Sequence, residues 1–547
     1  MKHERIMLAL GVCCVVGTPI WATASDSHTI ALKQIGRYAA GVSTNPDEPR
    51  AEISAFDPSS KRLFSINLNL RQLDVLDLSA PDTPVLVQAV PLGGKPNSVA
   101  VRSGVVAVAL EGAQKTDPGS VKFFDASGAF LNQLTVGALP DMLTFSPNGR
   151  WLLVANEGEP NSYHQPDSVD PEGSVSVIDM RGDVTGLTQT DVRTAAFTDA
   201  IPKENAASIR VFGPNATLAK DLEPEYITVS KDSKTAWVTL QENNAIGTLD
   251  IRSATFTKIV GLGFKDHLRP GHSLDASDRD VPGSSNNGII NIRPWPVLGM
   301  YQPDSIAAYR VKGRTYLVMA NEGDARDYTG FSEETRVGSL TLDAAAFAAQ
   351  GFPDVSTGPA GLRNNDNLGR LTVTNTQGNT DADADFEKLY AFGARSFSIR
   401  NAEGGLLYDS GDELEQRTAL LVPGSFNSNG TTDTFDTRSD NKGPEPEGLA
   451  LGKIGRHTYA FIGLERTGGV IVYDISRPGS PEFVTYATTA PTDLAPEGLL
   501  FIKRKDSPNG KPLLVVSHEI SNSIVIFEIE SASHEDDGDE EEDESDR

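Results

Sequence analysis

Residues 140–157 read Pro-Asp-Met-Leu-Thr-Phe-Ser-Pro-Asn-Gly-Arg-Trp-Leu-Leu-Val-Ala-Asn-Glu, and this stretch predicts one complete β-hairpin. Apolar and β-branched residues indicate two strands, and Ser146-Pro147-Asn148-Gly149 is typical of the turn between them. In an antiparallel hairpin, the start of the first strand lies beside the end of the second. The hairpin therefore brings Asp141 and Glu157 to the same end.

The same phrase recurs along the chain: a proline and a polar residue open one strand, and the next strand ends in glutamate. The other polar pairs are Asn97 and Glu111, Glu225 and Glu242, Asp304 and Glu322, Glu447 and Glu465, and Glu497 and Glu519. Most copies add a third strand ending in aspartate, such as Ser174–Asp179. Repeated units of three or four strands predict an all-β fold, a β-propeller of seven blades with eight as the alternative. Two tandem sandwiches would not explain why each unit restarts with the same phrase.

Eight strand-rich units fit this interpretation, starting near residues 55, 96, 140, 224, 303, 394, 446 and 496. The last unit has no fourth strand after it, so we predict that an N-terminal strand, Ile30–Tyr38, completes that blade and closes the ring. Long insertions rich in Gly, Asn, Asp and Pro are expected as loops near 181–220, 261–300, 330–390 and 425–445. Thr341–Gln350 is the one helix expected.

The two ends of the chain differ from the body. Lys2 and Arg5, an apolar run and Ala22-Thr23-Ala24 predict a signal peptide over 1–24, rather than an uncleaved membrane anchor. Cys13 and Cys14 lie inside it, so the mature chain would contain no cysteine. We therefore expect a propeller domain over 25–530, a disordered acidic tail over 531–547, and no transmembrane segment after cleavage. The predicted location is periplasmic or extracellular, and the predicted state is a monomer.

The formal net charge of −27 makes nucleic acid an unexpected partner and cations the natural counter-species. If the hairpins surround one axis, the repeated polar positions form a ring of acids that repel one another unless cations or shared protons neutralise them. Oxygen-only ligands favour Ca²⁺ or Mg²⁺. The candidate metal ligands are Asp141, Glu157, Glu225, Glu242, Asp304, Glu322, Glu447, Glu465, Glu497 and Glu519. Individual members could instead merely cap strands and bind neighbouring amides.

Basic residues follow several of these acids, notably Arg326, Arg466 and, in the insertion before Glu447, Arg438. This arrangement suits a phosphate ester, because a metal can polarise one oxygen of the phosphate while an arginine binds two others. Arg326, Arg438, Arg466 and Asp440 are therefore candidate catalytic residues of a phosphoesterase. The alternative is that the arginines only neutralise the ring. A further acidic run, Asp275–Asp280, has the composition of a calcium loop but not the EF-hand spacing.

Several longer phrases carry a resemblance to a known family. They are Leu139–Phe145, Ala155–Pro160, Asp170–Ser174, Leu222–Tyr226, Leu240–Ala245, Leu274–Asp280 and Lys442–Gly448. Over roughly residues 30 to 530, the chain resembles the choice-of-anchor I domain family of exported, propeller-like bacterial proteins. That family is similar to mesenchyme-specific cell-surface glycoproteins, and its members are often labelled alkaline-phosphatase-like. The phrase Pro444–Gly448 is also similar to phytase-like esterase domains.

The resemblance implies an exported or surface propeller. The acidic C-terminal tail has no sorting motif, which favours a periplasmic or released protein. The function expected from the sequence is an envelope or extracellular binding protein with a cation-binding channel. The alternative is a metal-dependent phosphoesterase in the same channel.

Overall fold

The structure is a computed structural model that describes residues 29–39, 53–281, 288–381 and 383–531. The predicted signal peptide over 1–24 and the tail beyond Ser531 lie outside these residues. No helix within the described ranges has both the length and the apolar character needed to cross a bilayer.

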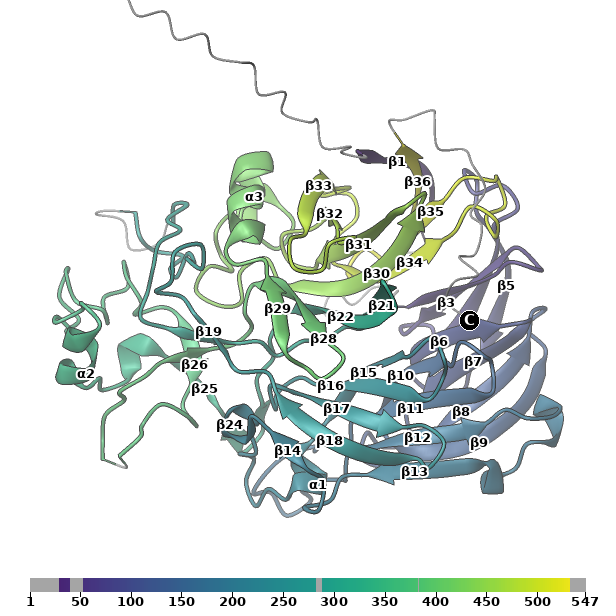
Figure 1. Ribbon diagram of the computed structural model, residues 1–547, viewed down its shortest axis with the longest axis horizontal. Helices are drawn as coiled ribbons and strands as arrows, with labels where there is room; N and C mark the ends of the chain where they lie inside the picture. The colour runs from purple at the N-terminus through teal and green to yellow at the C-terminus, as the bar shows by residue number, and fades with distance from the viewer. Residues whose placement is uncertain (1–28, 40–52, 282–287, 382, 532–547) are drawn as a thin grey trace, which may run out of the picture.

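Seven antiparallel sheets form the body of the molecule (Figure 1). The first three sheets contain β2 Ser54–Asp57, β3 Arg62–Asn67, β4 Gln72–Asp77 and β5 Val85–Pro91; β6 Pro96–Arg102, β7 Val105–Leu110, β8 Pro118–Asp125 and β9 Phe130–Ala138; and β10 Pro140–Phe145, β11 Trp151–Asn156, β12 Ser174–Asp179 and β13 Val192–Ala196. The fourth and fifth sheets contain β15 Pro224–Val229, β16 Thr235–Leu240, β17 Ala245–Asp250 and β18 Thr255–Gly261, with β14 Lys203–Glu204 parallel to β18; and β21 Ile306–Val311, β22 Arg314–Asn321, β28 Ser396–Asn401 and β29 Leu406–Asp409. The last two sheets contain β30 Pro446–Ile454, β31 His457–Leu464, β32 Val470–Asp474 and β33 Glu482–Ala487; and β34 Pro496–Ile502, β35 Leu513–His518, β36 Ser523–Ser531 and β1 Ile30–Ala39.

The first strands of these sheets meet around one axis. Strands β2, β6, β10, β15, β21, β30 and β34 contact one another in that order, and β34 contacts β2 to complete the circle. The later strands of each sheet lie progressively farther out. This is the β-propeller arrangement that the repeated hairpins predicted.

The N-terminal strand closes the circle, as the sequence predicted. β1 pairs antiparallel with β36 from Ile30 opposite Ser531 to Ala39 opposite Ser523. The pairing is reinforced by Arg37, whose Nε lies 2.8 Å from Oδ1 of the buried Asp493. The last sheet thus combines both ends of the described chain, which covers the edge of β36.

The fifth and sixth units expected from the sequence are one sheet. β22 pairs with β28 from Tyr316 opposite Asn401 to Asn321 opposite Ser396. The chain between these strands leaves the sheet and returns, so a single sheet appears in the sequence as two separated units. The irregularity at 394–409 therefore reflects an insertion within one sheet.

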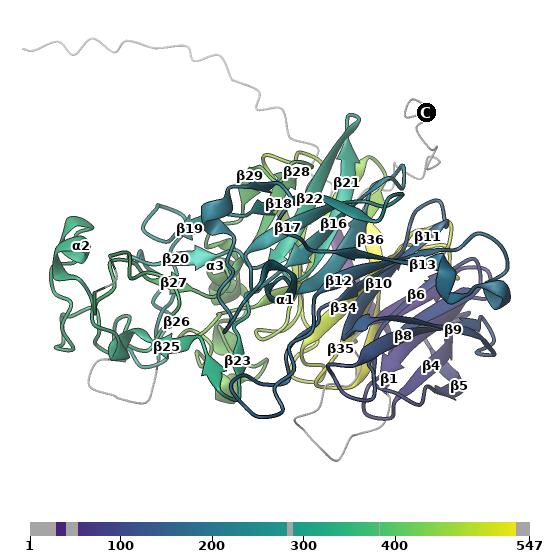
Figure 2. The ribbon, with the colours of Figure 1, turned by 90° about the horizontal axis from the view of Figure 1, so that it is seen from below.

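Much of the inserted chain forms a side module next to the ring (Figures 1 and 2). Its sheet has the order β19-β20-β27-β26-β25. The elements are β19 Phe264–Asp266, β20 Leu298–Met300, β25 Glu334–Arg336, β26 Thr372–Thr374, β27 Tyr390–Ala391 and helix α2 Ala344–Ala349, with the small hairpin β23 Asp327–Tyr328 and β24 Phe331–Ser332 nearby. Leu274, Trp295, Val337, Phe347 and Val373 belong to its separate apolar core.

The insertions are more structured than the loops expected from their composition. β13 lies within 181–220, and helix α3 Glu413–Leu421 was not anticipated. The remaining short helices are α1 Leu218–Asp221, η1 Val184–Gly186, η2 Gln189–Asp191, η3 Ala206–Ser208, η4 Val337–Ser339, η5 Pro423–Ser425 and η6 Thr432–Thr434. The predicted helix at 341–350 is confirmed as α2, which Asp343 caps by accepting a hydrogen bond from the Ala346 amide at 2.7 Å.

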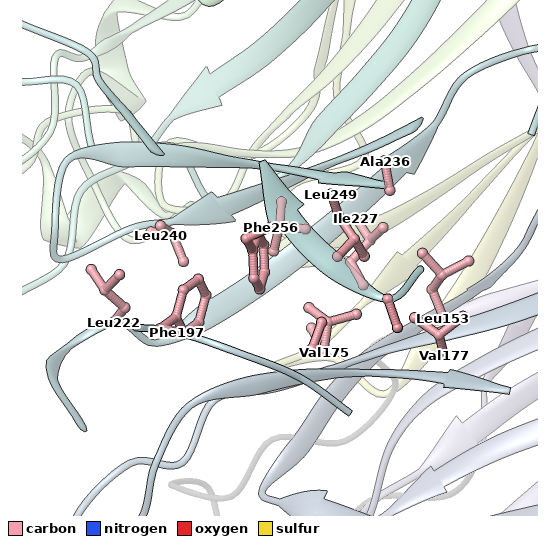
Figure 3. Packing of buried hydrophobic residues seen from close by; sticks show 14 of the residues in the cluster. Leu153, Val175, Val177, Phe197, Leu222, Ile227, Ala236, Leu240, Leu249 and Phe256 are labelled. Carbon is pink, nitrogen blue, oxygen red and sulfur yellow. The ribbon is translucent and has the colours of Figure 1, made fainter. Parts of the chain in front are cut away.

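Apolar side chains between neighbouring sheets hold the ring together. Figure 3 shows the cluster between the β10–β13 and β15–β18 sheets, where Val175, Ile227 and Leu249 are fully or almost fully buried. The rings of Phe197 and Phe256 stack there with their centroids 4.3 Å apart. Burial of each such side chain contributes about 1.5–3 kcal/mol. The rigid ring fixes the positions of the polar residues at its centre.

Candidate functional site

The hairpin registers place the repeated polar positions together. Pro140 pairs with Asn156, so the neighbouring Asp141 and Glu157 lie at the same end of the hairpin. The same register holds for Pro96 with Leu110, Pro224 with Leu240, Pro446 with Leu464 and Pro496 with His518. In these five hairpins the two polar positions lie at the same end, as the opening phrase predicted.

A bulge accompanies the first polar residue of most hairpins. Asp141 and Met142 together oppose a single residue of β11, because the register moves from Pro140–Asn156 to Leu143–Val154. The same arrangement of two residues opposite one occurs at Glu225, Glu447 and Glu497. Bulges of this kind redirect a side chain, and here four of them recur around one axis.

A small cavity lies where the first strands meet. Its volume is about 60 Å³, enough for a few water molecules or one partly hydrated ion. Polar side chains from five sheets line it, namely Asn97, Asp141, Asp304, Glu447 and Glu497. Most of the acids predicted to open the hairpins therefore do converge.

Three carboxylates form a compact group beside this cavity, where the hairpin ends meet around the axis of the ring. One oxygen from each of Asp141, Glu157 and Glu225 lies within 4.8 Å of the other two. Burial, together with neighbouring acids, raises the pKa of Asp141 to about 7 and raises those of Glu157 and Glu225 well above the ordinary carboxyl value. Among the described residues, no ion pair to a basic side chain reaches any of the three. We call this group the open triad.

A second trio of acids is paired with basic side chains. Oxygens of Glu322, Glu445 and Glu465 also lie within 4.8 Å of one another. Lys442 Nζ lies 2.6 Å from Glu322 and 3.2 Å from Glu445, and Arg466 Nη2 lies 2.9 Å from Glu465.

Arg438 also binds Glu445, so three cations face three acids. Burial acts to raise the pKa of Glu445, but Lys442, Arg438 and Arg466 together lower it to about 2. We call this trio the paired triad.

Arg326 is enclosed rather than open to the channel. Its side chain has no exposed surface, and its guanidinium pairs with Asp221 and, at 3.1 Å, with Glu223. Its Nη2 also donates to the Asp221 carbonyl at 2.6 Å. The guanidinium is thus held by two carboxylates and a backbone carbonyl.

Glu242 is 3% exposed, its Oε2 has no hydrogen-bond partner in the described chain, and burial raises its pKa to about 8.

The remaining predicted residues are placed as follows. Lys95 lies 2.7 Å from Glu111, and Asn97 Nδ2 donates to the Pro140 carbonyl at 3.2 Å. Burial raises the pKa of Glu519, as it does for Asp304 and Glu447. Asp440 lies away from the channel acids, where it pairs with Arg336 at 2.7 Å and Arg370 at 2.6 Å.

An open vestibule of about 220 Å³ adjoins the open triad. Lys95, Glu111, Lys115 and Glu159 line it together with Asp141 and Glu157. Lys115 pairs with Glu159, which also accepts a hydrogen bond from Tyr328 at 2.7 Å. Both lysines are already paired with Glu111 and Glu159, and the vestibule connects the open triad with solvent.

Sequence reasoning missed two acids that belong to these networks, Glu223 and Glu445. Each stands directly before the proline of its phrase, and each is fully buried. That shared position was a usable signal. Lys442, the cation between Glu322 and Glu445, carries no such signal, because its contact with Glu322 depends on how the 425–445 insertion folds back.

Comparison with known proteins gives one family and two distant relatives of known name. A model of the choice-of-anchor I domain matches residues 52–478. Gigasin-3a of Magallana gigas is 32% identical over 184 residues, which are 30% of this chain and 64% of the relative. The mesenchyme-specific cell surface glycoprotein of Strongylocentrotus purpuratus is 28% identical over 296 residues, which are 49% of this chain and 36% of the relative. The chain therefore spans less than two thirds of either relative.

Solved structures resemble the chain only weakly. Hydrazine synthase of Kuenenia stuttgartiensis superposes with a TM-score of 0.44 and 14% identity, covering 90% of this chain and 99% of that chain. The Cps50 (Swd1) β-propeller domain of Myceliophteria thermophila gives a TM-score of 0.43 and 9% identity, covering 91% and 99%. These likenesses say nothing about activity.

Proposed function

The chain belongs to the choice-of-anchor I domain family, and from that premise we propose that it is an exported binding protein that holds a divalent cation, Ca²⁺ or Mg²⁺, at the acidic end of its propeller channel. The propeller fold and the family together suggest an exported surface or binding protein. The sea-urchin relative is named a cell surface glycoprotein, which agrees with an extracellular or periplasmic location.

The observation that carries the proposal is the contrast between the two triads. Both have three carboxylate oxygens within 4.8 Å of one another, but only Glu322, Glu445 and Glu465 are matched by basic side chains. The three carboxyl groups of the open triad are crowded into a partly buried place, where either shared protons or a bound cation must offset their mutual repulsion. The ligand atoms are all oxygens, which suits Ca²⁺ or Mg²⁺. The vestibule supports access from solvent.

Calorimetric titration of metal-stripped protein with Ca²⁺, and separately with Mg²⁺, tests the proposal. We expect binding by the native chain and binding at least about tenfold weaker after Glu157→Gln, because the variant loses one charged ligand. Glu445→Gln is the matched control, since it removes an acid from the paired triad. Native affinity in Glu157→Gln would place the cation elsewhere.

The phosphoesterase alternative uses the same channel and ranks second. Binding a phosphate ester through Arg326, Arg438 or Arg466 requires displacing carboxylates that already hold these arginines. An aryl phosphate assay with and without Ca²⁺ decides between the two functions. Metal-dependent hydrolysis that disappears in Glu157→Gln would favour the enzyme, whereas cation binding without hydrolysis favours the binding protein.

A further inference from the structure

A second group of buried acids lies outside the channel, between two insertions. Asp275, Asp280 and Asp436 are 1%, 5% and 0% exposed. Asp275 accepts a hydrogen bond from the Asn291 amide at 2.6 Å, and Asp280 accepts one from the Ile289 amide at 2.9 Å. The acids at 275 and 280 therefore share one strap, residues 288–291.

Two buried oxygens of the 425–445 insertion have no partner, and their residues are joined through Ser439, which accepts from Asn427 Nδ2 at 2.9 Å and donates to Asp436 Oδ1 at 2.5 Å. Oδ2 of Asp436 and Oδ1 of Asn427 are both buried without a hydrogen bond in the described part of the chain. Both residues are 0% exposed. A Cβ added to Gly288 would lie 1.5 Å from Asp436 Oδ2, so this oxygen faces the strap that holds Asp275 and Asp280. Both orphaned atoms are acceptors, and what they lack is a donor or a cation.

The ion pairs around this group of acids also favour a cation here. Glu415, which accepts hydrogen bonds from the Asp275 amide at 3.2 Å and from Asn427 Nδ2 at 2.8 Å, is paired with Arg395 at 2.7 Å. No ion pair to Asp275, Asp280 or Asp436 exists among the residues described.

The basic groups nearby are already used. Arg370 binds Asp278 and Asp440, and Arg336 binds Asp440. Arg293 lies close enough for its charge to act on Asp275 and Asp280, but it donates its hydrogen bond to Asn367 at 2.6 Å rather than to either acid. The three enclosed carboxyl groups are thus not bound by any basic side chain of the described residues.

We propose that Asp275, Asn427 and Asp436 hold a Ca²⁺ ion that is separate from the channel cation and that ties the 275–280 loop to the 425–445 insertion. Ca²⁺ accepts carboxylate and amide oxygens together in irregular geometry, whereas Mg²⁺ demands a near-ideal octahedron and keeps its waters. The ion supplies what both orphaned oxygens lack, and it offsets the excess negative charge. It also braces the segment that carries Arg438 and Lys442 to the paired triad.

Terbium luminescence tests this site, because Tb³⁺ replaces Ca²⁺ and emits when a nearby tryptophan is excited. Trp295 packs in the same apolar cluster as Leu274 and Ala276, which flank Asp275. We expect tryptophan-sensitised emission from native full-length protein, its loss in Asp436→Asn and in Trp295→Phe, and competition by Ca²⁺. Glu157→Gln is the matched control, which should keep the emission while its channel binding is weakened.

Asp436→Asn is nearly isosteric and removes a buried charge, so the variant is expected to fold, and its melting temperature in chelator should equal or exceed the native value. Asp275→Asn tests the same site should Asp436→Asn fail to fold. Calcium titration should give two binding events in the native protein and one in Asp436→Asn. Sensitised emission that persists in Asp436→Asn, or two binding events in that variant, would overturn the proposal without touching the channel site.

Discussion

Replacing Glu157 by glutamine should stabilise the protein without metal and destabilise it with metal. The oxygens of the open triad lie within 4.8 Å of one another. Two unit charges at that separation repel by about 3.5 kcal/mol at an effective dielectric constant of about 20. Proton sharing relieves part of this repulsion, so we expect metal-free Glu157→Gln to be about 1–3 kcal/mol more stable than the native protein.

With Ca²⁺ bound, the sign reverses. The variant replaces a charged ligand by a neutral amide, and a hydrogen bond or contact to a charged group is worth about 1.5–3 kcal/mol. The dissociation constant for Ca²⁺ should therefore rise by about tenfold to a hundredfold.

Thermal unfolding in chelator and in saturating Ca²⁺, combined with calorimetry, measures both effects. An unfolding entropy of about 2.1 cal/mol/K per residue makes 1 kcal/mol equivalent to about 1 °C in a chain of 547 residues. The chelated variant should therefore melt about 1–3 °C above the native protein. Equal destabilisation with and without Ca²⁺, at unchanged affinity, would refute the reasoning and show that Glu157 merely caps a strand.

Three further predictions follow from the same contacts. Glu445→Gln should cost about 3–5 kcal/mol in thermal or denaturant unfolding and leave Ca²⁺ affinity unchanged, because it leaves buried cations without their acid; a neutral effect on stability would contradict the paired triad. In chelator, the free energy of unfolding should fall as the pH rises from about 5 to about 8. The carboxyl groups of Asp141 and Glu242 have pKa values near 7 and 8 in the fold, well above the value near 4 of an unfolded chain. Their contribution to stability is therefore complete at low pH and is lost as they ionise in the fold. Saturating Ca²⁺ should flatten that melting series, and a fall that Ca²⁺ leaves unchanged would count against a channel cation. Arg37→Ala should lower the free energy of unfolding by about 1–3 kcal/mol, since it leaves the buried Asp493 without its charged partner at the ring closure, and unchanged denaturant unfolding would show that β1 closes the ring by backbone pairing alone.

Local sequence was enough to predict the hairpins and the closing strand. Alternation sets which residues face inward, and the turn at Ser146–Gly149 fixes the register, so Asp141 and Glu157 had to meet. Strand β1 was predictable because the last unit lacked a partner for β36. Helix α3 was missed because Glu413–Leu421 has a weak amphipathic pattern and lies among turn residues.

The shared fifth sheet could not be read from local pattern. β22 ends at Asn321 and β28 begins at Ser396, and the chain between them builds part of the side module. Hydrophobic periodicity identifies each strand but does not say which strand lies beside it. Two halves of one sheet therefore looked like two units.

The sequence by itself determined that acids would gather at one end of a propeller channel, because each hairpin is a local structure that repeats. Only the tertiary structure decided which acids are paired with basic side chains. Lys442 reaches Glu322 and Arg326 reaches Asp221 across more than a hundred residues of chain, and no spacing rule predicts such contacts. Whether an acid has a basic partner depends on distances of a few ångströms between segments that only folding brings together. The difference between the open triad and the paired triad therefore appears only in the folded structure.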